Sequence, residues 1–417
     1  MVTEPTGGAR AVARCDFLGE APYSDTPGML FRSYLSPAFA RTQEAIGGWM
    51  AAAGMRVSLD AAANLVGRYD GTDANAPALL IGSHIDSVRD AGRYDGPLGV
   101  MLGIECVATL HAAGRRMPFA VEVIAFGDEE GSRFPASMLT SRAVAGTLDP
   151  AALQVADAGD VALTDALTAF GCNAADYHRA ARPPGSVLAY LEAHIEQGPV
   201  LEAEDLPVGI VTGIAAQLRF RIEVTGTAGH AGTTTMALRR DALTGTAEMV
   251  LAAEIIARAD DSDLVATVGA IAAQPGAANV IPGAVTFTLD VRSGDQGRRD
   301  AAADAMLEQF RTISDARGLG IVVEQVNDLP PSPCDRRLSD LLADAVREHG
   351  IVPRRLVSGA GHDAMIMAAL CPTAMLFIRC AGGVSHNPAE AVEVRDVEIA
   401  LAAMRGFIDR LGASCAA

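Results

Sequence analysis

The sequence predicts an α/β fold, in which a mostly parallel sheet carries an inserted α+β domain. Two apolar runs, 78–83 and 119–126, are predicted to be buried strands, and helix-like stretches at 97–113 and 136–146 follow them. Strands that alternate with helices in this way are typical of a parallel sheet. From Leu218 onward apolar and polar residues alternate, which indicates a sheet with one solvent-exposed face. With 417 residues, the chain is long enough for two domains.

The α/β pattern occurs on both sides of the alternating segment. It begins with a helix predicted over 28–54, where apolar side chains recur at helical spacing and Gly54 ends the run. It returns near the C-terminus with a helix at 335–349, a strand at 373–379 and a helix at 395–411. We therefore expect one domain built from 1–212 and 331–417, with 213–330 inserted into it.

The inserted segment mixes alternating strands with helix-like runs. In chain order the pattern predicts a strand at 218–225, a helix at 241–259, strands at 264–271 and 285–292, a helix at 298–316 and a strand at 320–326. The linker-like Pro330-Pro331-Ser332-Pro333 follows. This order predicts a small α+β domain.

Composition narrows the possible partners. The formal net charge is −18, and every basic residue is arginine, so nucleic acid and anionic membranes are not expected as partners. No uninterrupted apolar run is long enough to cross a membrane, and residues 1–14 lack the apolar segment of a signal peptide. Seven cysteines without a CxxC motif favour reduced thiols. A cytoplasmic location is the expectation.

A histidine and two aspartates follow the first buried strand. His84 and Asp86 lie at its carboxyl end, and Asp95 comes in the glycine-rich segment Arg93-Tyr94-Asp95-Gly96. A lone histidine in such a loop is usually structural, but the added carboxylates favour a metal site. We expect His84 to be a ligand, Asp86 to orient its ring and Asp95 to bridge two ions.

The second buried strand ends in adjacent carboxylates, Glu129 and Glu130. Neighbouring side chains diverge, so one can bind metal while the other faces the reacting water. The alternative is a solvated acidic turn before a helix, where carboxylates also suit the helix dipole.

Two further histidines lie at expected strand ends, His194 in EAHIEQGP and His386 in GGVSHNP. Together with His84, Asp95 and one glutamate they give five ligands, which is enough for two divalent ions that share a carboxylate. Zinc suits this mixture of imidazole and carboxylate, and manganese suits its carboxylates.

The remaining candidates are less specific. His230 follows the first strand of the inserted segment, and both a turn histidine and a contact to the substrate remain open for it. His362 precedes Asp363 at an expected helix start, where Asp363 is the expected cap. For His362 we favour a role on the substrate side.

Taken together, these motifs resemble the dinuclear-metal amidohydrolase family that includes allantoate amidohydrolase, N-carbamoyl-L-amino-acid hydrolase and β-ureidopropionase, within the aminoacylase and aminopeptidase superfamily. The resemblance extends from about Phe31 to Leu411. The motifs that carry it, in order, are GSHIDSV, YDGPLGV, DEEGSRF, EAHIEQGP, GHAGTT, ANVIPG, GAGHDA and GGVSHNP. Thr235, where relatives often have proline, and Ala389-Glu390-Ala391 depart slightly from the family pattern.

The resemblance implies roles for individual residues. The metal ligands would be His84, Asp95, Glu130, His194 and His386, with Glu129 as general base and Asp86 behind His84. Residues Gln217, Asn279 and Arg292 match positions that bind the carboxylate of the substrate, and His230 matches a residue that reaches the active site of the neighbouring subunit. The inserted domain would then serve as lid and dimerisation domain of a homodimer.

The same resemblance favours allantoate as the substrate, and hence a role in purine degradation. No residue distinguishes allantoate from an N-carbamoyl-L-amino acid on physical grounds, so a carbamoylase is the main alternative. A peptidase or aminoacylase, and an inactive metal-binding homologue, are the remaining alternatives.

Overall fold

The computed structural model describes residues 5–415, which separate into two compact units that are described one at a time. The first unit holds the described residues up to Thr212, together with Cys334–Leu356 and the chain from Gly361 onward. The second unit holds Gly213–Pro333 and the short segment Val357–Ala360. The sequence pattern placed the insertion at 213–330 and did not predict that 357–360 joins it.

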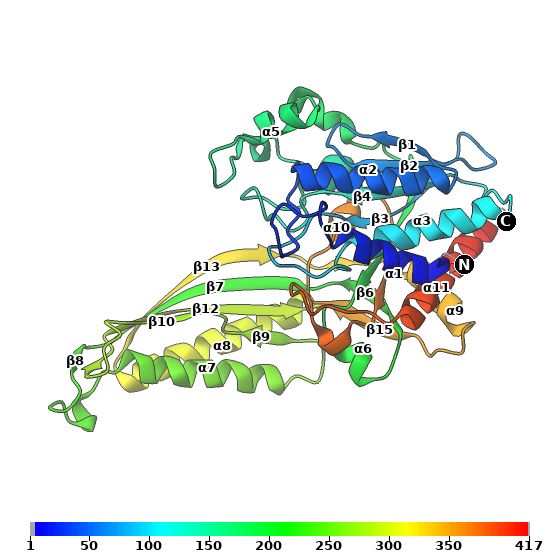
Figure 1. The fold of residues 1–417 in the computed structure, drawn as a ribbon. Helices are drawn as coiled ribbons and strands as arrows, with labels where there is room; N and C mark the ends of the chain where they lie inside the picture. The colour runs from blue at the N-terminus through cyan, green and yellow to red at the C-terminus, as the bar shows by residue number, and fades with distance from the viewer. Residues whose placement is uncertain (1–4, 416–417) are drawn as a thin grey trace. The chain divides into compact units, whose positions relative to one another are not determined.

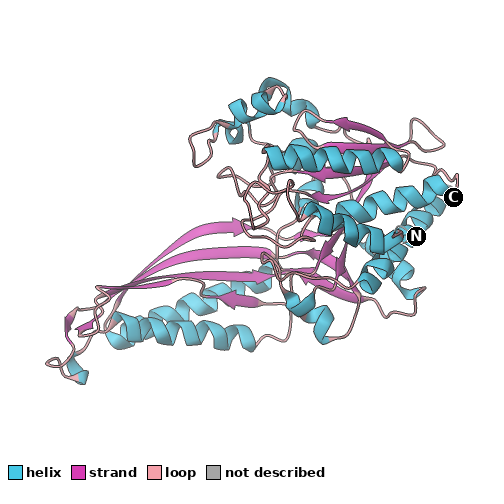
Figure 2. Ribbon diagram, viewed as in Figure 1, coloured by secondary structure: helices cyan, strands magenta, loops and turns pink. Residues whose placement is uncertain are grey.

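The first unit is built on a mixed sheet whose centre is parallel (Figures 1 and 2). Its strands, in spatial order, are β1 (Arg56–Leu59), β2 (Leu65–Tyr69), β4 (Val121–Phe126), β3 (Ala78–His84), β5 (Val187–Ile195), β16 (Thr373–Ile378) and β6 (Val208–Ile214). Strand β15 (Arg354–Ser358) also pairs with β6, and β14 (Ser332–Pro333) pairs with Gly213 and Ile214 at the end of β6. Strands β4, β3, β5 and β16 are parallel neighbours, whereas β2 and β6 are antiparallel to them.

The parallel centre follows from the apolar sequence of its strands. All residues of β3, β4 and β16 are buried, as expected for strands covered on both faces. The predicted α/β fold with a mostly parallel sheet is thus confirmed at the centre of the sheet. Its antiparallel strands were not predicted, and two of them, β1 and β2, are too short to show a clear pattern.

Helices cover this sheet. They are α1 (Gly7–Leu18), α2 (Pro37–Ala52), α3 (Pro97–Ala112), α4 (Leu139–Ala145), α5 (Leu163–Phe170), α6 (Val200–Ala203), α9 (Arg336–Arg347), α10 (Asp363–Met367) and α11 (Val394–Cys415), with 3₁₀ turns at Pro150–Gln154, Ala174–Ala180 and Ala381–Gly383. Helix α3 is buried along most of its length and packs on β3, β4 and β5. None of the helices within residues 5–415 combines the length and the apolar composition that a membrane span needs.

One predicted helix starts later than the sequence pattern suggested. The apolar spacing over 28–54 predicted a single helix, but α2 begins only at Pro37. The Ser36 side chain accepts a hydrogen bond from the backbone N–H of Phe39 at 3.0 Å and so caps the helix. Just before it, Leu35 has a φ of 60°, which turns the chain out of the helical path.

The second unit is a sheet covered on one face by two helices (Figure 1). Its strands are β7 (Ala216–Thr225), β8 (Gly229–His230), β9 (Val265–Thr267), β10 (Ile271–Gln274), β11 (Val280–Ile281), β12 (Ala284–Ser293) and β13 (Gly320–Leu329), and its helices are α7 (Ala242–Arg258) and α8 (Gln296–Arg317), with a 3₁₀ turn at Met236–Leu238. The main sheet has the order β10-β12-β7-β13 with β9 beside β12, while β8 and β11 form a separate pair.

Burial along β7 confirms the predicted alternation, because its apolar residues are buried and the polar residues between them are exposed. The apolar face packs against α7 and α8, with Phe220, Phe287, Met249 and Phe310 in one core. The prediction of a single strand at 264–271 was wrong in detail, since the chain forms two short strands there, β9 and β10.

Candidate active site

Four parallel strands bring the predicted metal ligands to one edge of the first unit's sheet. His84 ends β3, and His194 is the penultimate residue of β5. The acidic turn follows β4, and the loop with His386 follows β16. The carboxyl ends of parallel strands lie at a common edge, where ligand sites of α/β proteins are usually found.

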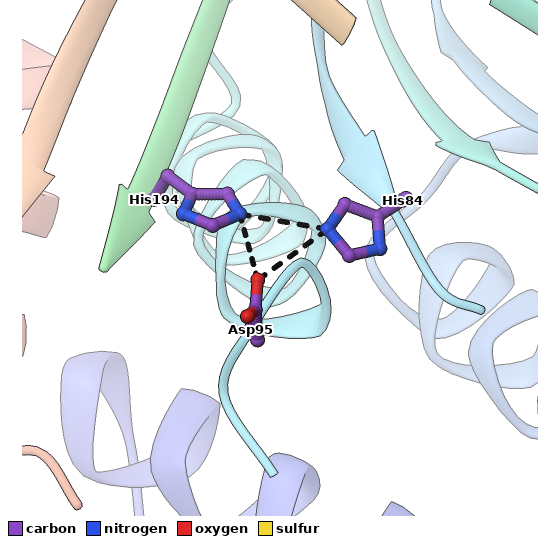
Figure 3. A group of neighbouring side chains, drawn as sticks. All are labelled: His84, Asp95 and His194. Carbon is purple, nitrogen blue, oxygen red and sulfur yellow. Dashed lines mark hydrogen bonds and ion pairs between the residues drawn. The ribbon is translucent and has the colours of Figure 1, made fainter. Parts of the chain in front are cut away.

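His84, Asp95 and His194 form the first group of candidate ligands, and Figure 3 shows the three side chains converging. The Oδ1 atom of Asp95 lies 3.1 Å from His194 Nε2 and 3.5 Å from His84 Nε2. The two Nε2 atoms lie 3.5 Å apart, and all three side chains are buried. Two imidazole nitrogens and a carboxylate oxygen at this spacing fit a divalent cation.

Both histidine rings are held by backbone carbonyl groups. Nδ1 of His194 lies 2.9 Å from the carbonyl oxygen of Ile195, and Nδ1 of His84 lies 3.1 Å from that of Asp86. A ring whose Nδ1–H donates to a carbonyl carries its free lone pair on Nε2. The lone pairs of the two rings therefore face Asp95.

Asp95, Glu130 and His386 form the second group. His386 Nε2 lies 3.4 Å from Oδ2 of Asp95 and 3.5 Å from Oε1 of Glu130. Asp95 thus directs Oδ1 toward the first group and Oδ2 toward the second, which is the geometry of a bridging carboxylate. The His386 side chain is about half exposed, at 49%.

Asp86 is buried and connects His84 to the acidic turn. Its Oδ1 lies 3.6 Å from Nδ1 of His84. Its two oxygens accept hydrogen bonds from the backbone N–H groups of Glu129, at 3.1 Å, and Glu130, at 3.2 Å. One side chain therefore fixes both a histidine and the turn that carries the two glutamates.

The two glutamates have different surroundings. The Glu130 carboxylate lies beside His386, and burial raises its pKa to about 7. A carboxylate oxygen of Glu129 lies within 4.8 Å of a ring nitrogen of His84 and of a carboxylate oxygen of Glu130. Burial also raises the pKa of Glu129 well above its ordinary value. The sequence alternative of a solvated acidic turn does not fit these buried carboxyl groups.

His362 lies behind the first group. Its ring is buried and meets the ring of His194 edge-on, with centroids 4.4 Å apart. Burial lowers the pKa of His362 well below its ordinary value, so the ring is neutral. His362 is itself the N-cap of α10, and Asp363 is the first helical residue. The expectation that Asp363 caps this helix was therefore wrong.

Several polar residues around Asp95 were not assigned from the sequence. Gln197 Nε2 donates a hydrogen bond to Asp95 Oδ2 at 2.8 Å, and Ser385 Oγ lies 2.6 Å from the same oxygen. Both residues belong to the motifs around His194 and His386. Position within a motif was the available signal, but their contacts to Asp95 depend on the folding of distant segments.

In the second unit, Gln217 and Arg292 lie opposite each other on β7 and β12 and share a partner, Asp290. Gln217 Nε2 donates to Asp290 Oδ2 at 2.8 Å, and Arg292 Nε donates to Asp290 Oδ1 at 2.8 Å. Burial raises the pKa of Asp290, but hydrogen bonds from Arg292 and Arg219 outweigh burial and hold this pKa below its ordinary value. Two of the predicted substrate residues are thus brought together.

His230 and Asn279 form another pair beside the two-stranded sheet of β8 and β11, where His230 is opposite Val280, the residue after Asn279. The backbone N–H of Ala231 donates to the carbonyl oxygen of Asn279 at 3.0 Å, and both side chains are exposed. Nδ1 of His230 accepts a hydrogen bond from Gly232 N–H at 3.0 Å, so the ring proton of neutral His230 is on Nε2.

The two pairs of the second unit lie near opposite ends of β7. Gln217 is near its first residue, and the chain reaches β8 only after its last residue, Thr225. The strand rises about 3.4 Å per residue, so the eight steps from Gln217 to Thr225 span roughly 27 Å. The structure therefore does not bring His230 and Asn279 together with Gln217 and Arg292 within this unit.

Two groups of histidine and carboxylate ligands around a shared aspartate are typical of hydrolases that use divalent metals. A model of the peptidase family M20/M25/M40 matches residues 80–410, and the chain belongs to this family. It is accordingly a hydrolase, as the sequence motifs predicted.

Individual relatives narrow the resemblance. The chain is 39% identical to allantoate deiminase 2 of Glycine max, over 96% of this chain and 89% of that protein. It is 41% identical to an N-carbamoyl-L-amino acid amidohydrolase of Geobacillus stearothermophilus, over 92% of this chain and 93% of that protein. Among solved structures, a hydantoinase/carbamoylase family amidase of Burkholderia ambifaria has a TM-score of 0.89 and 38% identity, with 97% of each chain covered.

Proposed function

We propose that the protein hydrolyses the ureido (carbamoyl) C–N bond of allantoate, releasing ammonia and carbon dioxide, in purine degradation. The observation that carries the hydrolytic part is the position of Asp95, whose two oxygens each face a different group of histidine and carboxylate side chains. The choice of allantoate rests on the resemblance to allantoate deiminases over nearly the whole chain.

His84, Asp95 and His194 would hold one divalent ion, and Asp95, Glu130 and His386 the other. Bound there, two such ions supply Lewis-acid polarisation of a carbonyl group and lower the pKa of an attacking water. Mixed nitrogen and oxygen donors suit zinc and manganese, and we propose one of these as the native metal.

Glu129 is the proposed general base. Its carboxyl group lies beside His84 and Glu130 without being needed for either ligand group. It would accept a proton from the attacking water and return it to the departing nitrogen. Burial raises the pKa of Glu129 above its ordinary value, which makes its carboxylate a stronger proton acceptor.

Arg292 and Gln217 are the proposed contacts for the substrate carboxylate. Asp290 accepts hydrogen bonds from Nε and Nη2 of Arg292, at 2.8 and 3.1 Å. A guanidinium group has five N–H donors in a planar fork, so donors on its terminal nitrogens remain for an anionic ligand.

His230 and Asn279 are proposed to serve the active site of a second subunit. They lie beyond the far end of β7, which is roughly 27 Å from Gln217 along the strand, so the two pairs cannot contact the same small substrate. In a homodimer formed through the second unit, the Nε2–H of His230 would donate to the oxyanion in the partner's site. The exposed side chains of both residues are compatible with this role.

An N-carbamoyl-L-amino acid is the second candidate substrate, because the identity to a carbamoylase, 41%, equals or exceeds that to the allantoate deiminases. The deciding experiment measures ammonia release by the metal-loaded protein from allantoate and from a panel of N-carbamoyl-L-amino acids. We expect turnover of allantoate far above the panel. Turnover of the panel alone would make the protein a carbamoylase, and inactivity on both with two metals bound would point to a peptidase or an inactive homologue.

A further inference from the structure

Glu390 is a buried carboxylate to which the proposed function gives no role. It lies in the loop that follows β16, and its exposed fraction is 5%. Antiparallel backbone pairing between Cys380 and Val392, an isolated β-bridge, closes this loop at its base. His386, a proposed metal ligand, lies four residues before Glu390 in the same loop.

One oxygen of Glu390 holds the backbone of the segment that carries Asp95. Oε1 accepts hydrogen bonds from the backbone N–H groups of Tyr94, at 2.8 Å, and Asp95, at 3.1 Å. The Glu390 carboxylate can come this close to the backbone only because residue 92 is glycine: a Cβ atom at Gly92 would lie 2.2 Å from Cδ of Glu390. The carboxylate is therefore enclosed by the segment that it binds.

The other oxygen of Glu390 is linked to the side chain of Asp95. Oε2 lies 3.1 Å from Ser385 Oγ, and this hydroxyl lies 2.6 Å from Asp95 Oδ2. Ser385 Oγ is placed to donate its one hydrogen to either carboxylate, and its contact to Asp95 Oδ2 is the shorter of the two. Glu390 thus reaches both the backbone and, through Ser385, the carboxylate of Asp95.

We propose that Glu390 is a positioning residue that sets the spacing between Asp95 and His386, and with it the affinity for the second divalent ion. These two ligands belong to segments about 290 residues apart in the sequence, and His386 Nε2 lies 3.4 Å from Asp95 Oδ2. Groups that orient metal ligands by hydrogen bonding contribute strongly to metal affinity. The inference rests on the proposed metal site, so its test must also show whether that site exists.

The test is a calorimetric titration of Zn²⁺ into the metal-free, full-length protein. The parent protein is expected to bind two ions. Glu390→Ala should weaken the second ion about 10- to 100-fold, the usual effect of losing such a partner. Glu390→Gln should bind both ions nearly as the parent does, because its amide oxygen can accept from Tyr94 and Asp95 and its amide N–H can donate to Ser385 Oγ.

Two matched variants separate positioning from other effects. Gly92→Ala keeps the Glu390 side chain but pushes its carboxylate out of position, so this variant should also lose affinity for the second ion. Glu393→Ala removes an exposed carboxylate three residues further along and should leave both affinities unchanged. Gly92→Ala also decides the question if Glu390→Ala does not fold, which thermal unfolding of the metal-free protein reveals.

The outcomes keep the inference apart from the proposed function. A parent protein that does not bind two ions contradicts the proposed metal site itself. A parent that binds two ions, with Glu390→Ala and Gly92→Ala binding them equally well, contradicts only the positioning role. Equal losses in Glu390→Ala and Glu390→Gln would also overturn it, since the charge rather than the hydrogen bonds would then matter.

Discussion

At the scale of single residues, Glu129 and Glu130 are neighbours in the chain but not equivalent in the site. Glu130 lies 3.5 Å from His386, whereas Glu129 lies beside His84 and takes no part in the Asp95, Glu130 and His386 group. Glu129→Gln keeps the size of the side chain and removes its ability to accept a proton. We expect kcat to fall about 10²- to 10⁴-fold, the usual contribution of general acid–base catalysis, while calorimetry still detects two bound ions.

The exposed Glu393 provides the control for that substitution, since Glu393→Gln makes the same chemical change away from the site. A Glu129→Gln enzyme that turns over at nearly the parent rate would show that another group moves the proton. Loss of a metal ion in the same variant would instead make Glu129 a ligand.

A second residue-scale prediction concerns Asp363, which is fully buried at the start of α10. Burial, and then the nearby Glu192 carboxylate, raise its pKa to about 8 from an ordinary value of 3.8. The folded protein therefore holds this proton over a range of pH in which the unfolded chain has released it. Stability gained from the proton is complete below about pH 4 and is lost as the pH rises through about 8.

The measurement is the Tm of the metal-free protein between pH 5.5 and 8.5. We expect the parent Tm to fall with rising pH, and Asp363→Asn to fall less steeply, because the amide does not titrate. Other buried carboxyl groups leave some slope in the variant. Asp304→Asn, an exposed control, should keep the parent slope. Equal slopes in the parent and Asp363→Asn would contradict this account of Asp363.

Sequence patterns located the side chains that converge in the site, but not those that hold them in place. His84, His194 and His386 follow apolar runs, so their common position at one sheet edge could be predicted. Gln197, Ser385 and Glu390 reach Asp95 through contacts between segments far apart in the chain. No local pattern encodes such contacts, and they became visible only in the folded structure.

At the scale of elements, the central strands could be predicted because burial on both faces demands an unbroken apolar run. The edge strands β1 and β2 have only four and five residues, too few for periodicity to distinguish them from loops. The start of α2 was missed for a different reason. Apolar residues before Pro37 fit the helical spacing, yet Ser36 and Pro37 form a cap and first turn that fix the start.

Helix α3 gives an element-scale prediction, because its packing on β5 depends on Gly99. A Cβ atom at Gly99 would lie 2.2 Å from the carbonyl oxygen of Ala193, which is backbone next to His194 and cannot rotate away. Gly99→Ala should therefore lower the free energy of unfolding by about 1–3 kcal/mol, as overpacking usually does. Urea unfolding of the metal-free protein measures this change.

Gly48 in α2 is the matched control, since nothing lies within 4 Å of a Cβ atom added there. Alanine in an exposed helix interior is more stable than glycine by roughly 0.5–1 kcal/mol, so Gly48→Ala should stabilise the protein. If Gly99→Ala were as stable as Gly48→Ala, α3 could move away from β5 at little cost, and the close packing would not constrain His194.

At the scale of the whole molecule, the change from buried apolar runs to alternating strands predicted where the second unit begins, near Gly213. The short segment 357–360, which returns to that unit, carries no such change in pattern. The sequence also could not reveal that the proposed substrate residues form two separate pairs. That separation follows from the length of β7, with Gln217 near one end and His230 beyond the other.

This separation predicts that two subunits share each active site. A subunit with Glu129→Gln lacks the proton acceptor, and a subunit with His230→Ala lacks the donor that the partner's site requires. Each variant alone should be nearly inactive. In a mixed dimer one site combines an intact Glu129 from one chain with an intact His230 from the other, and the second site lacks both. Random pairing of equal amounts makes half of the dimers mixed, so roughly one quarter of all sites should regain activity.

Dissociating and reassociating the mixture, followed by the ammonia-release assay, measures the recovery. The same treatment of each variant alone is the control. No recovery, with mixed dimers demonstrated by mass spectrometry, would place His230 in the site of its own chain or outside catalysis altogether.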